Sequence, residues 1–504
     1  MTRTLLPAVL LACVCSYVEA KPNILFIMSD DHTTQAVGAY GSRLAKVDPT
    51  PVIDSLAKNG MRFDRVFCNN SICVPSRASI ITGQYSQRNG IIVLGGQIPP
   101  ERQYLAIEMK KAGYSTAMVG KWHLSAEPAA FDFYCVLPGQ GKYHNPDFHV
   151  RGDKPWRRNK ITRSGQHSSD AITDISLEWL KNGRDKNKPF FLMHHFKAPH
   201  DMFQNAKRYN SYLEDVDIPE PDNLHNQPAD GFGSVATRKF GAGVTKAHPS
   251  WGLPRKLGVD PKLQEPEHGK LAYQKYLKRY LRCVKGVDDN VKRLLDYLGE
   301  TGELENTVLM YTGDQGFFLG EHDLMDKRWM YEEGMRMPFI VHWPKGVKKG
   351  QVNDWLINNT DFAPTILELA GAEKTPDYMQ GRSFAAAVNG DKKPDDWRKV
   401  TYYRYWMHMA HSLKVPAHFG IRSDRYKLIL FYGLSVAGTN PTPVAWEFYD
   451  LEKDPFEMKN EYNNPEYKQL IAGMKEQLKT TRKELGEEDK NPKILEVIEK
   501  HWDD

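Results

Sequence analysis

Continuous apolar runs and amphipathic stretches alternate along most of the chain. The first run, ILFIMS at residues 24–29, is apolar at successive positions, which is typical of a strand buried on both faces of a parallel sheet. Four further runs have the same character, at residues 114–119, 190–196, 307–311 and 339–343. Helical spacing of apolar residues between these runs predicts helices at residues 51–58, 103–111, 169–180, 271–298 and 362–369.

This alternation predicts an α/β fold, with a large, mostly parallel central sheet flanked by helices on both faces. In such sheets, ligands bind outside the carboxyl ends of the strands. Polar residues stand at two of these ends, because Asp30, Asp31 and His32 follow the first run, and Asp314 and Gln315 follow the run at residues 307–311. We therefore expect the functional site at this edge of the sheet.

The pattern changes in two places. Residues 201–267 are rich in Pro, Gly, Asn and His and lack a clear periodicity, so we expect a long insertion that shapes the substrate cleft. After about residue 390, strand-like segments at 419–432 and 446–449 precede a helical pattern at 466–485. These features predict a catalytic domain at residues 21–389 and a smaller C-terminal α+β subdomain at residues 390–504.

Composition narrows the class of protein. With 504 residues, 40% of them hydrophobic, the chain is long enough for a large domain with a buried core and a smaller appended unit. Lys and Arg number 68 against 63 Asp and Glu, and the small net charge of +5 does not fit a protein that coats a polyanion, so we expect no nucleic-acid partner. The four cysteines beyond the first twenty residues are too few and too scattered for a disulfide scaffold.

The first twenty residues have the pattern of a cleavable secretory signal, with Arg3, an apolar run from Leu5 to Val14 and a small residue at Ala20. The run is too short to span a bilayer, and no other apolar stretch approaches about 18 residues. Residues 10–13 also fit a lipoprotein cleavage box, which would leave a lipid anchor on Cys13. We expect an exported protein, periplasmic or secreted, without a transmembrane segment, and lipid anchoring is the alternative.

The most specific motif is the segment from Cys73 to Arg77, with the sequence CVPSR. Pro75 suits the first turn of a helix, so Cys73 would lie at a helix N-terminus, where free N–H groups favour an anion. Arg77 is four residues further on, on the same helical face, and can hold anionic oxygens. Taken alone, Cys73 can also be a structural cysteine before an ordinary helix.

The polar residues after the two strand-like runs form the second candidate site. Adjacent carboxylates such as Asp30 and Asp31 repel each other unless a positive charge lies between them. Oxygen-bearing side chains without clustered thiols or imidazoles suit a hard cation, calcium or magnesium, which would polarise a bound anion. In isolation, each aspartate can also belong to a solvated turn or a helix cap.

The motif around Cys73 resembles the C-x-P-S-R signature of the type I sulfatases, in which a dedicated maturing enzyme oxidises the cysteine to formylglycine. These enzymes belong to the alkaline phosphatase superfamily. The resemblance extends over nearly all of the chain after the first twenty residues. It implies an alkaline-phosphatase-like fold and a sulfuric ester hydrolase, in which one hydroxyl of the hydrated formylglycine attacks sulfur and the other later expels sulfate.

The resemblance also implies a ligand set for the metal. The family positions correspond to Asp30, Asp31, Cys73, Asp314 and Gln315. The family more often has asparagine at the last of these positions. Calcium is the expected ion, with magnesium as the alternative.

Three further segments resemble family elements. In the segment GKWHL at residues 120–124, Lys121 would bind a sulfate oxygen and His123 would contact the modified cysteine. His200 matches a candidate general acid for the leaving alkoxide, a role that suits a group titrating near neutrality, although Met202 replaces the usual proline two residues later. The segment at residues 320–332 places Lys327 as a second cationic contact to the ester or bridging oxygen.

The expected substrate is a sulfated carbohydrate, because segments 273–288 and 327–338 resemble the sulfatases that act on polysaccharides and glycosaminoglycans. Candidate contacts to a sugar or a second anion are Arg404, His408, His411 and His418, which can equally be ordinary polar residues. Two alternatives stay open. One is a formylglycine-dependent phosphodiesterase or phosphonate monoester hydrolase, and the other is a non-catalytic binder of sulfated glycans whose cysteine is never converted.

Overall fold

The computed structural model describes residues 20–228 and 231–504. The predicted signal segment and the alternative anchor at Cys13 therefore lie outside the described residues, apart from Ala20. Within the described ranges, none of the helices is both long enough and apolar enough to cross a membrane.

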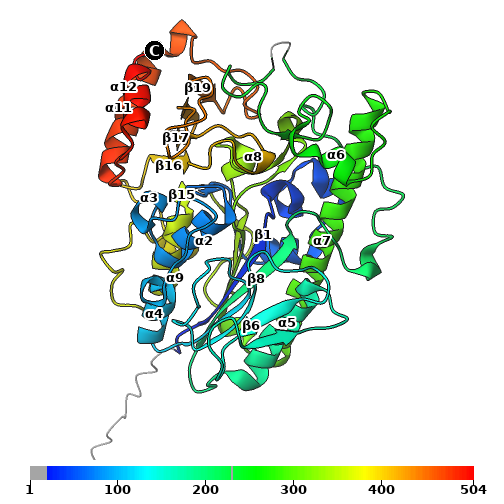
Figure 1. Cartoon of the computed structure of the whole chain (residues 1–504). Coiled ribbons are helices and arrows are strands. Elements are labelled where there is room, and N and C mark those ends of the chain that lie inside the picture. Colours follow the sequence, from blue (N-terminus) through cyan, green and yellow to red (C-terminus); the bar gives the residue numbers. More distant parts are fainter. Residues whose placement is uncertain (1–19, 229–230) are drawn as a thin grey trace, which may run out of the picture.

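A ten-stranded sheet forms the centre of the molecule (Figure 1). Its five middle strands are mutually parallel, and β13, β6 and β7 pair antiparallel towards the two sides. The predicted α/β fold with a mostly parallel sheet is confirmed. In spatial order the strands are β14 (Gln351–Asn353), β2 (Met61–Phe63), β13 (Phe339–His342), β10 (Thr307–Gly313), β1 (Asn23–Asp30), β8 (Phe190–Pro199), β4 (Ser115–Lys121), β5 (Phe133–Leu137), β6 (Asp147–Val150) and β7 (Lys160–Thr162).

Helices cover both faces of this sheet, and each face has its own apolar core. One face carries α1 (Pro51–Lys58), α5 (Ser168–Glu178) and α7 (Glu267–Glu300), and the other carries α2 (Cys73–Thr82), α4 (Tyr104–Lys111) and α9 (Phe362–Leu369). Every residue of β1 is buried, as expected for a strand with a helical layer on each side. All five helices predicted from periodicity are present within a few residues of the expected bounds.

Short elements complete the large unit. The helices among them are α3 (Ser86–Asn89), α6 (Leu253–Lys256), α8 (Glu332–Met335) and α10 (Ala385–Val388). The strands are β3 (Val66–Phe67), β9 (Ala242–Gly243), β11 (Phe318–Leu319), β12 (Leu324–Asp326) and β15 (Ile357–Asn358). Among the described residues from 201 to 228 and from 231 to 266, the regular structure is limited to β9, α6 and single turns, which agrees with the predicted insertion.

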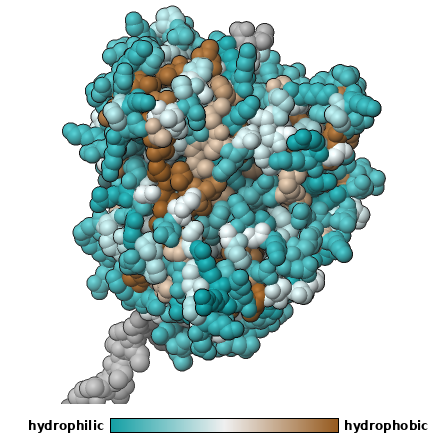
Figure 2. Space-filling view, viewed as in Figure 1, coloured by the Kyte–Doolittle hydropathy of each residue, from teal (hydrophilic) through white to brown (hydrophobic). Residues whose placement is uncertain are grey.

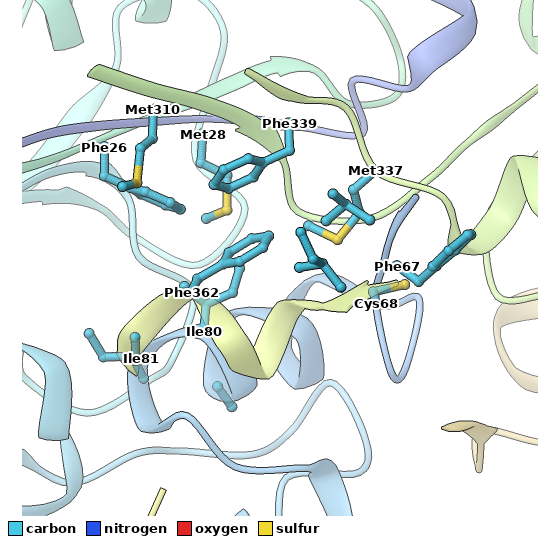
Figure 3. Packing of buried hydrophobic residues seen from close by; sticks show 14 of the residues in the cluster. Phe26, Met28, Phe67, Cys68, Ile80, Ile81, Met310, Met337, Phe339 and Phe362 are labelled. Carbon is cyan, nitrogen blue, oxygen red and sulfur yellow. The ribbon is translucent and has the colours of Figure 1, made fainter. Parts of the chain in front are cut away.

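The helix that begins at Cys73 is held firmly by apolar packing. Figure 3 shows Phe362 of α9 between the sheet residues Phe26 and Met28 and the helix α2, which contributes Ile80 and Ile81. Both isoleucines are 1% exposed, and burying such a side chain stabilises a fold by about 1.5–3 kcal/mol. The packing therefore fixes the position of Cys73 relative to the ends of the strands.

The C-terminal part contains an antiparallel sheet of β16 (Val400–Tyr405), β17 (His418–Ser423), β18 (Tyr426–Phe431) and β19 (Ala445–Asp450). Helix α11 (Lys468–Glu484) packs against it, and α12 (Pro492–Lys500) follows. β16 and α12 were not expected from the sequence, and the domain boundary at residue 390 stays a prediction. Hydrophilic residues cover most of the face seen in Figure 2, and hydrophobic residues gather in a band beside the C-terminal helices.

Candidate active site

Four neighbouring parallel strands bring candidate residues to one edge of the sheet. Lys121 ends β4 and Asp30 ends β1, while His200 directly follows β8 and Asp314 directly follows β10. These strands are adjacent in the order β10, β1, β8, β4. The registers place Ser29 beside Gly313 and Asp30 beside Pro199, so residues far apart in sequence meet at the carboxyl ends of the strands.

Three carboxylates meet at this edge. Asp30, Asp31 and Asp314 are fully buried, and one oxygen of each lies within 4.8 Å of the others. Burial and the charge of Asp30 raise the pKa of Asp314 to about 7. Burial also disfavours ionisation of Asp30, but Lys121, His200 and Arg77 outweigh it and hold the pKa of Asp30 well below its usual value. Carboxylates in such close contact need positive charge to stay ionised together.

Gln315 adds a fourth oxygen-bearing side chain to the three carboxylates. Its Nε2 donates to Asp31 Oδ1, whereas its buried Oε1 has no hydrogen-bond partner. A buried carbonyl oxygen without a partner costs free energy unless something positive faces it. Three carboxylates and one free amide oxygen suit a hard divalent cation, so the residues present fit the calcium or magnesium ion that the sequence predicts.

Cys73 faces the same cluster from the N-terminus of α2. Its Sγ lies 3.4 Å from Asp30 Oδ1 and 3.9 Å from Lys121 Nζ, and the side chain lines a cavity. Burial and the neighbouring Asp30 charge raise the pKa of the Cys73 thiol. A protonated thiol is a poor nucleophile, so an unmodified cysteine is not activated here.

Three buried cations surround the carboxylates. Arg77 donates from Nε to Asp314 Oδ2 at 3.1 Å, and its Nη2 forms ion-pair contacts with Asp314 Oδ2 at 2.9 Å and with Asp30 Oδ1 at 3.5 Å. Lys121 pairs with Asp30 and donates to Gln140 Oε1 at 2.6 Å. Lys327 Nζ contacts both oxygens of Asp31, at 2.5 and 2.6 Å. The structure thus brings Arg77, Lys121 and Lys327 together, as the sequence predicts.

The two candidate histidines differ in their surroundings. His200 Nε2 lies 3.8 Å from Asp31 Oδ2, its Nδ1 lies 2.5 Å from Asp201 Oδ1, and its side chain lines the cavity with Cys73. His123 has a buried Nδ1 without a partner, and burial followed by the charge of Lys121 lowers its pKa to about 2. No hydrogen bond joins the described residues His123 and Cys73, so the predicted contact between them stays a prediction.

The cavity beside Cys73 has a volume of about 460 Å³. Burial and the charge of Lys121 lower the pKa of one lining residue, Lys197, to about 8. A larger cavity of about 730 Å³ lies between α11 and α12 and contains none of the candidate residues. The 460 Å³ cavity is lined by Ile72, Cys73, Leu94, Gln140, Gly141, Lys197, His200, Asp201, Trp251, Asp326, Lys327, Arg328, His411 and Leu413.

Several of these residues were not identified from the sequence. Asp201 and Arg328 directly follow His200 and Lys327, and this adjacency was the available signal. Trp251 comes from the long insertion, as expected of a segment that shapes the cleft. His195 also supports the site, since its Nδ1 lies 3.3 Å from Arg77 Nη1 and 3.2 Å from the Lys121 carbonyl oxygen.

The predicted sugar contacts in the C-terminal unit are mostly wrong. Arg404 is fully buried and pairs with Glu487 and Asp489. His418 is also fully buried, with Nδ1 bonded to the Pro416 carbonyl oxygen. Both ring nitrogens of His408 are hydrogen-bonded to backbone groups. Of the four candidates, His411 alone lines the cavity, where its Nδ1 lies 3.5 Å from Arg328 Nη2.

Comparisons with known proteins agree with this geometry. The family model described as Sulfatase matches residues 22–372, and the model described as N-sulphoglucosamine sulphohydrolase, C-terminal, matches residues 320–484. The chain is 38% identical to an N-acetylglucosamine-6-O-sulfatase of Bacteroides thetaiotaomicron, over 94% of this chain and 88% of the relative. It is 27% identical to the N-acetylglucosamine-6-sulfatase of Homo sapiens, over 76% of this chain and 67% of the relative.

A solved structure is also similar over almost the full length. It is described as a complex with its substrate D-glucosamine-2-N,6-O-disulfate. The two chains superpose with a TM-score of 0.83 at 36% identity, covering 93% of this chain and 99% of the other. A phosphonate monoester hydrolase from Silicibacter pomeroyi superposes with a TM-score of 0.69 at 22% identity, which reflects the shared fold.

Proposed function

This chain belongs to the sulfatase family and is a sulfuric ester hydrolase, and from this premise we propose that it removes a 6-O-sulfate from a glucosamine-type sugar. The observation that carries the proposal is the convergence of Cys73, His200 and Lys327 on one cavity, where each of them contacts one of three clustered buried carboxylates. The similarity to an N-acetylglucosamine-6-O-sulfatase and to a glucosamine disulfate complex supports this choice of sugar.

Cys73, oxidised to formylglycine, is the proposed nucleophile. Its place at the first turn of α2 directs backbone N–H groups towards an anion bound above it. The raised thiol pKa supports the need for modification, because a buried, protonated thiol beside Asp30 would attack sulfur poorly. The family's maturing enzyme is the partner that this modification requires.

Asp30, Asp31, Asp314 and Gln315 are the proposed holders of a divalent cation, calcium in the first place. When bound, such an ion would polarise the sulfate and favour a deprotonated nucleophile. Lys121, 3.9 Å from Cys73 Sγ, and Lys327, paired with Asp31, then supply fixed positive charge, while Arg77 bridges Asp314 and Asp30. Preorganised cations of this kind stabilise the negative charge that develops on transferring oxygens.

His200 is the proposed proton donor to the leaving alkoxide. Its Nδ1 is held by Asp201, which orients the ring and leaves Nε2 on the side of Asp31 and the cavity. We propose further that the protein is exported, in agreement with the apolar segment at residues 5–14.

Sulfate release from defined sulfated saccharides tests the proposal. The matured protein should release sulfate from N-acetylglucosamine 6-O-sulfate, and Cys73→Ala should lose this activity while it keeps the wild-type melting temperature. Intact-mass spectrometry must accompany the assay, because conversion to formylglycine replaces sulfur by oxygen and removes two hydrogens. Modified protein with bound metal that releases no sulfate, or that prefers an aryl phosphodiester to an aryl sulfate, would contradict the proposal.

A further inference from the structure

A second cavity adjoins the candidate active site. It has a volume of about 550 Å³ and is lined by Met202, Phe203, Gln204, Asn205, Asn210, Lys256, Arg279 and Arg282. Three of these eight side chains are cationic, three are amides and none is acidic. Such a lining suits an anionic, hydroxyl-rich ligand rather than an apolar one.

The two cavities share a wall. Asp201 lines the cavity of Cys73, and the next residue, Met202, lines the second cavity. Trp251 lines the first cavity, and Lys256 of the second cavity places its Nζ 3.1 Å from the centroid of the Trp251 ring. The two cavities are therefore neighbours, with Asp201, Met202, Trp251 and Lys256 between them.

The cations of the second cavity are unequally paired. Arg282 donates from Nε to the Tyr212 carbonyl oxygen at 2.8 Å and pairs with Glu214 through Nη2. Lys256 is held on the Trp251 ring, and its pKa is lowered by burial, with the charge of Arg255 acting in the same direction and Asp201 opposing it. The guanidinium of Arg279, a half-buried residue of α7, has no hydrogen bond or ion pair with any residue that the structure describes.

Helix α7 thus presents the guanidinium of Arg279, which has no partner among the described residues. Helix α7 spans 34 residues and packs on β8 and α5, and α6, which carries Lys256, lies beside its upper half (Figure 1). A guanidinium presents a fixed fork of donors that matches a carboxylate or a sulfate, and a position on a helix fixes its direction. Neighbouring Lys256 adds a second positive charge.

We propose that this cavity is a subsite for a second, anionic sugar unit, so that the substrate is an oligosaccharide rather than a free monosaccharide. The sulfated unit lies beside Cys73, and the carboxylate or sulfate of the adjoining unit binds Arg279 and Lys256. The amide side chains of Gln204, Asn205 and Asn210 face the hydroxyl groups of this second unit. The inference rests on the proposed function for the position of the first sugar.

The test compares substrates that differ in the second unit. The 6-O-sulfated N-acetylglucosamine is supplied as a monosaccharide and as disaccharides whose second sugar carries a carboxylate, a sulfate or no charge. For Arg279→Ala, the ratio of kcat/KM on an anionic disaccharide to kcat/KM on the monosaccharide should fall about tenfold, the loss of one charge-assisted contact. The same ratio for the neutral disaccharide should change less than about twofold.

Lys270→Ala is the matched control, because Lys270 lies on the same helix, carries the same charge and is exposed away from both cavities. It should leave all ratios at the wild-type value. The carboxylate and sulfate arms identify which anion the subsite prefers, and a selective loss in either arm supports the proposal. Equal losses on all substrates, or no loss on either anionic disaccharide, would overturn it.

A binding measurement separates this proposal from the proposed catalytic function. In the Cys73→Ala background, calorimetric titration with the anionic disaccharides gives a Kd that does not depend on turnover. Adding Arg279→Ala should weaken that Kd about tenfold for the preferred anion. Unchanged Kd values for both anionic disaccharides would refute the subsite even if sulfate release were normal, and a weakened Kd would support it even if sulfate release were absent.

Discussion

Two clusters of buried charge in this molecule differ in how well their carboxylates are paired with positive charge. In the C-terminal unit, Arg404 and Arg482 face Glu487 and Asp489, and all four carboxylate oxygens accept hydrogen bonds. At the end of the central sheet, Asp30, Asp31 and Asp314 crowd one another, and the amide oxygen of Gln315 has no partner. The carboxylates of the first cluster are satisfied by protein donors, although Arg404 Nε has no partner among the described residues, and we propose that a cation from outside completes the second cluster.

The pKa values of Asp489 and Asp314 shift in opposite directions, in line with the difference between the two clusters. Burial disfavours ionisation of Asp489, but Arg404 and Arg482 outweigh it and lower its pKa. For Asp314, burial and the charge of Asp30 prevail over Arg77 and raise the pKa to about 7. Removing one partner of a buried ion pair is strongly destabilising because the other charge is left uncompensated, whereas carboxylates held together against repulsion are typical of a functional site.

The largest expected effect concerns the cluster around Arg404. Arg404→Ala removes one of the two cations that pair with Glu487 and Asp489 and leaves these buried carboxylates undercompensated, so we expect the free energy of unfolding to fall by about 3–5 kcal/mol. Urea unfolding measures this loss. Below the melting range, kcat/KM should stay at the wild-type value, because the Arg404 side chain does not line the cavity of Cys73. A stable Arg404→Ala protein with impaired turnover would show that the two clusters had been assigned the wrong roles.

At the cluster of Asp30, Asp31 and Asp314, we expect a large loss of turnover and little loss of stability. Asp314→Asn keeps the shape of the side chain but removes one charge of the cation site, so kcat should fall by about 10²- to 10³-fold, equivalent to about 3–4 kcal/mol. In the absence of divalent ions, its free energy of unfolding should change by less than about 1 kcal/mol, since a repulsive charge has been removed. Calcium should raise the melting temperature of the wild type and not that of Asp314→Asn. Equal stabilisation of both would argue against a metal at Asp314.

The two clusters also differ in how well the roles of their residues could be predicted from the sequence. Asp30, Asp31, Asp314 and Gln315 were predictable, because each stands directly after an apolar run and the carboxyl ends of parallel strands meet at one edge. Arg404 was misread as a ligand contact because its partners, Glu487 and Asp489, lie more than 80 residues away and no local pattern links them.

The wall of the cavity was equally hidden from the sequence. Trp251, Asp326 and His411 come from three separate loops or short strands, and only the tertiary fold brings them to Cys73. Strand β16 was missed for a related reason: its register with β17 is set by long-range pairing, and its residues carry no turn signal comparable to those around β18. Strongly periodic helices, by contrast, were placed within a few residues.

The smallest expected effect is a pH dependence. Because the folded-state pKa of Asp489 is depressed, its contribution to stability is present above the unfolded pKa of about 4 and is lost as the pH falls through the folded value. In Arg404→Ala that pKa should return towards normal. The difference in free energy of unfolding between wild type and Arg404→Ala should therefore shrink between pH 5 and pH 3, as measured by urea titration at each pH. A constant difference would contradict the assigned ion pair.

Direct observation of the cation tests the central claim. Crystals of the wild-type protein grown with calcium, together with elemental analysis of the dissolved crystals, report both the place and the number of bound ions. The account predicts one divalent ion per chain, in contact with Asp30, Asp31, Asp314 and the Oε1 of Gln315. Full calcium saturation with the three carboxylates still paired only to Arg77, Lys121 and Lys327, and no ion among them, would contradict it.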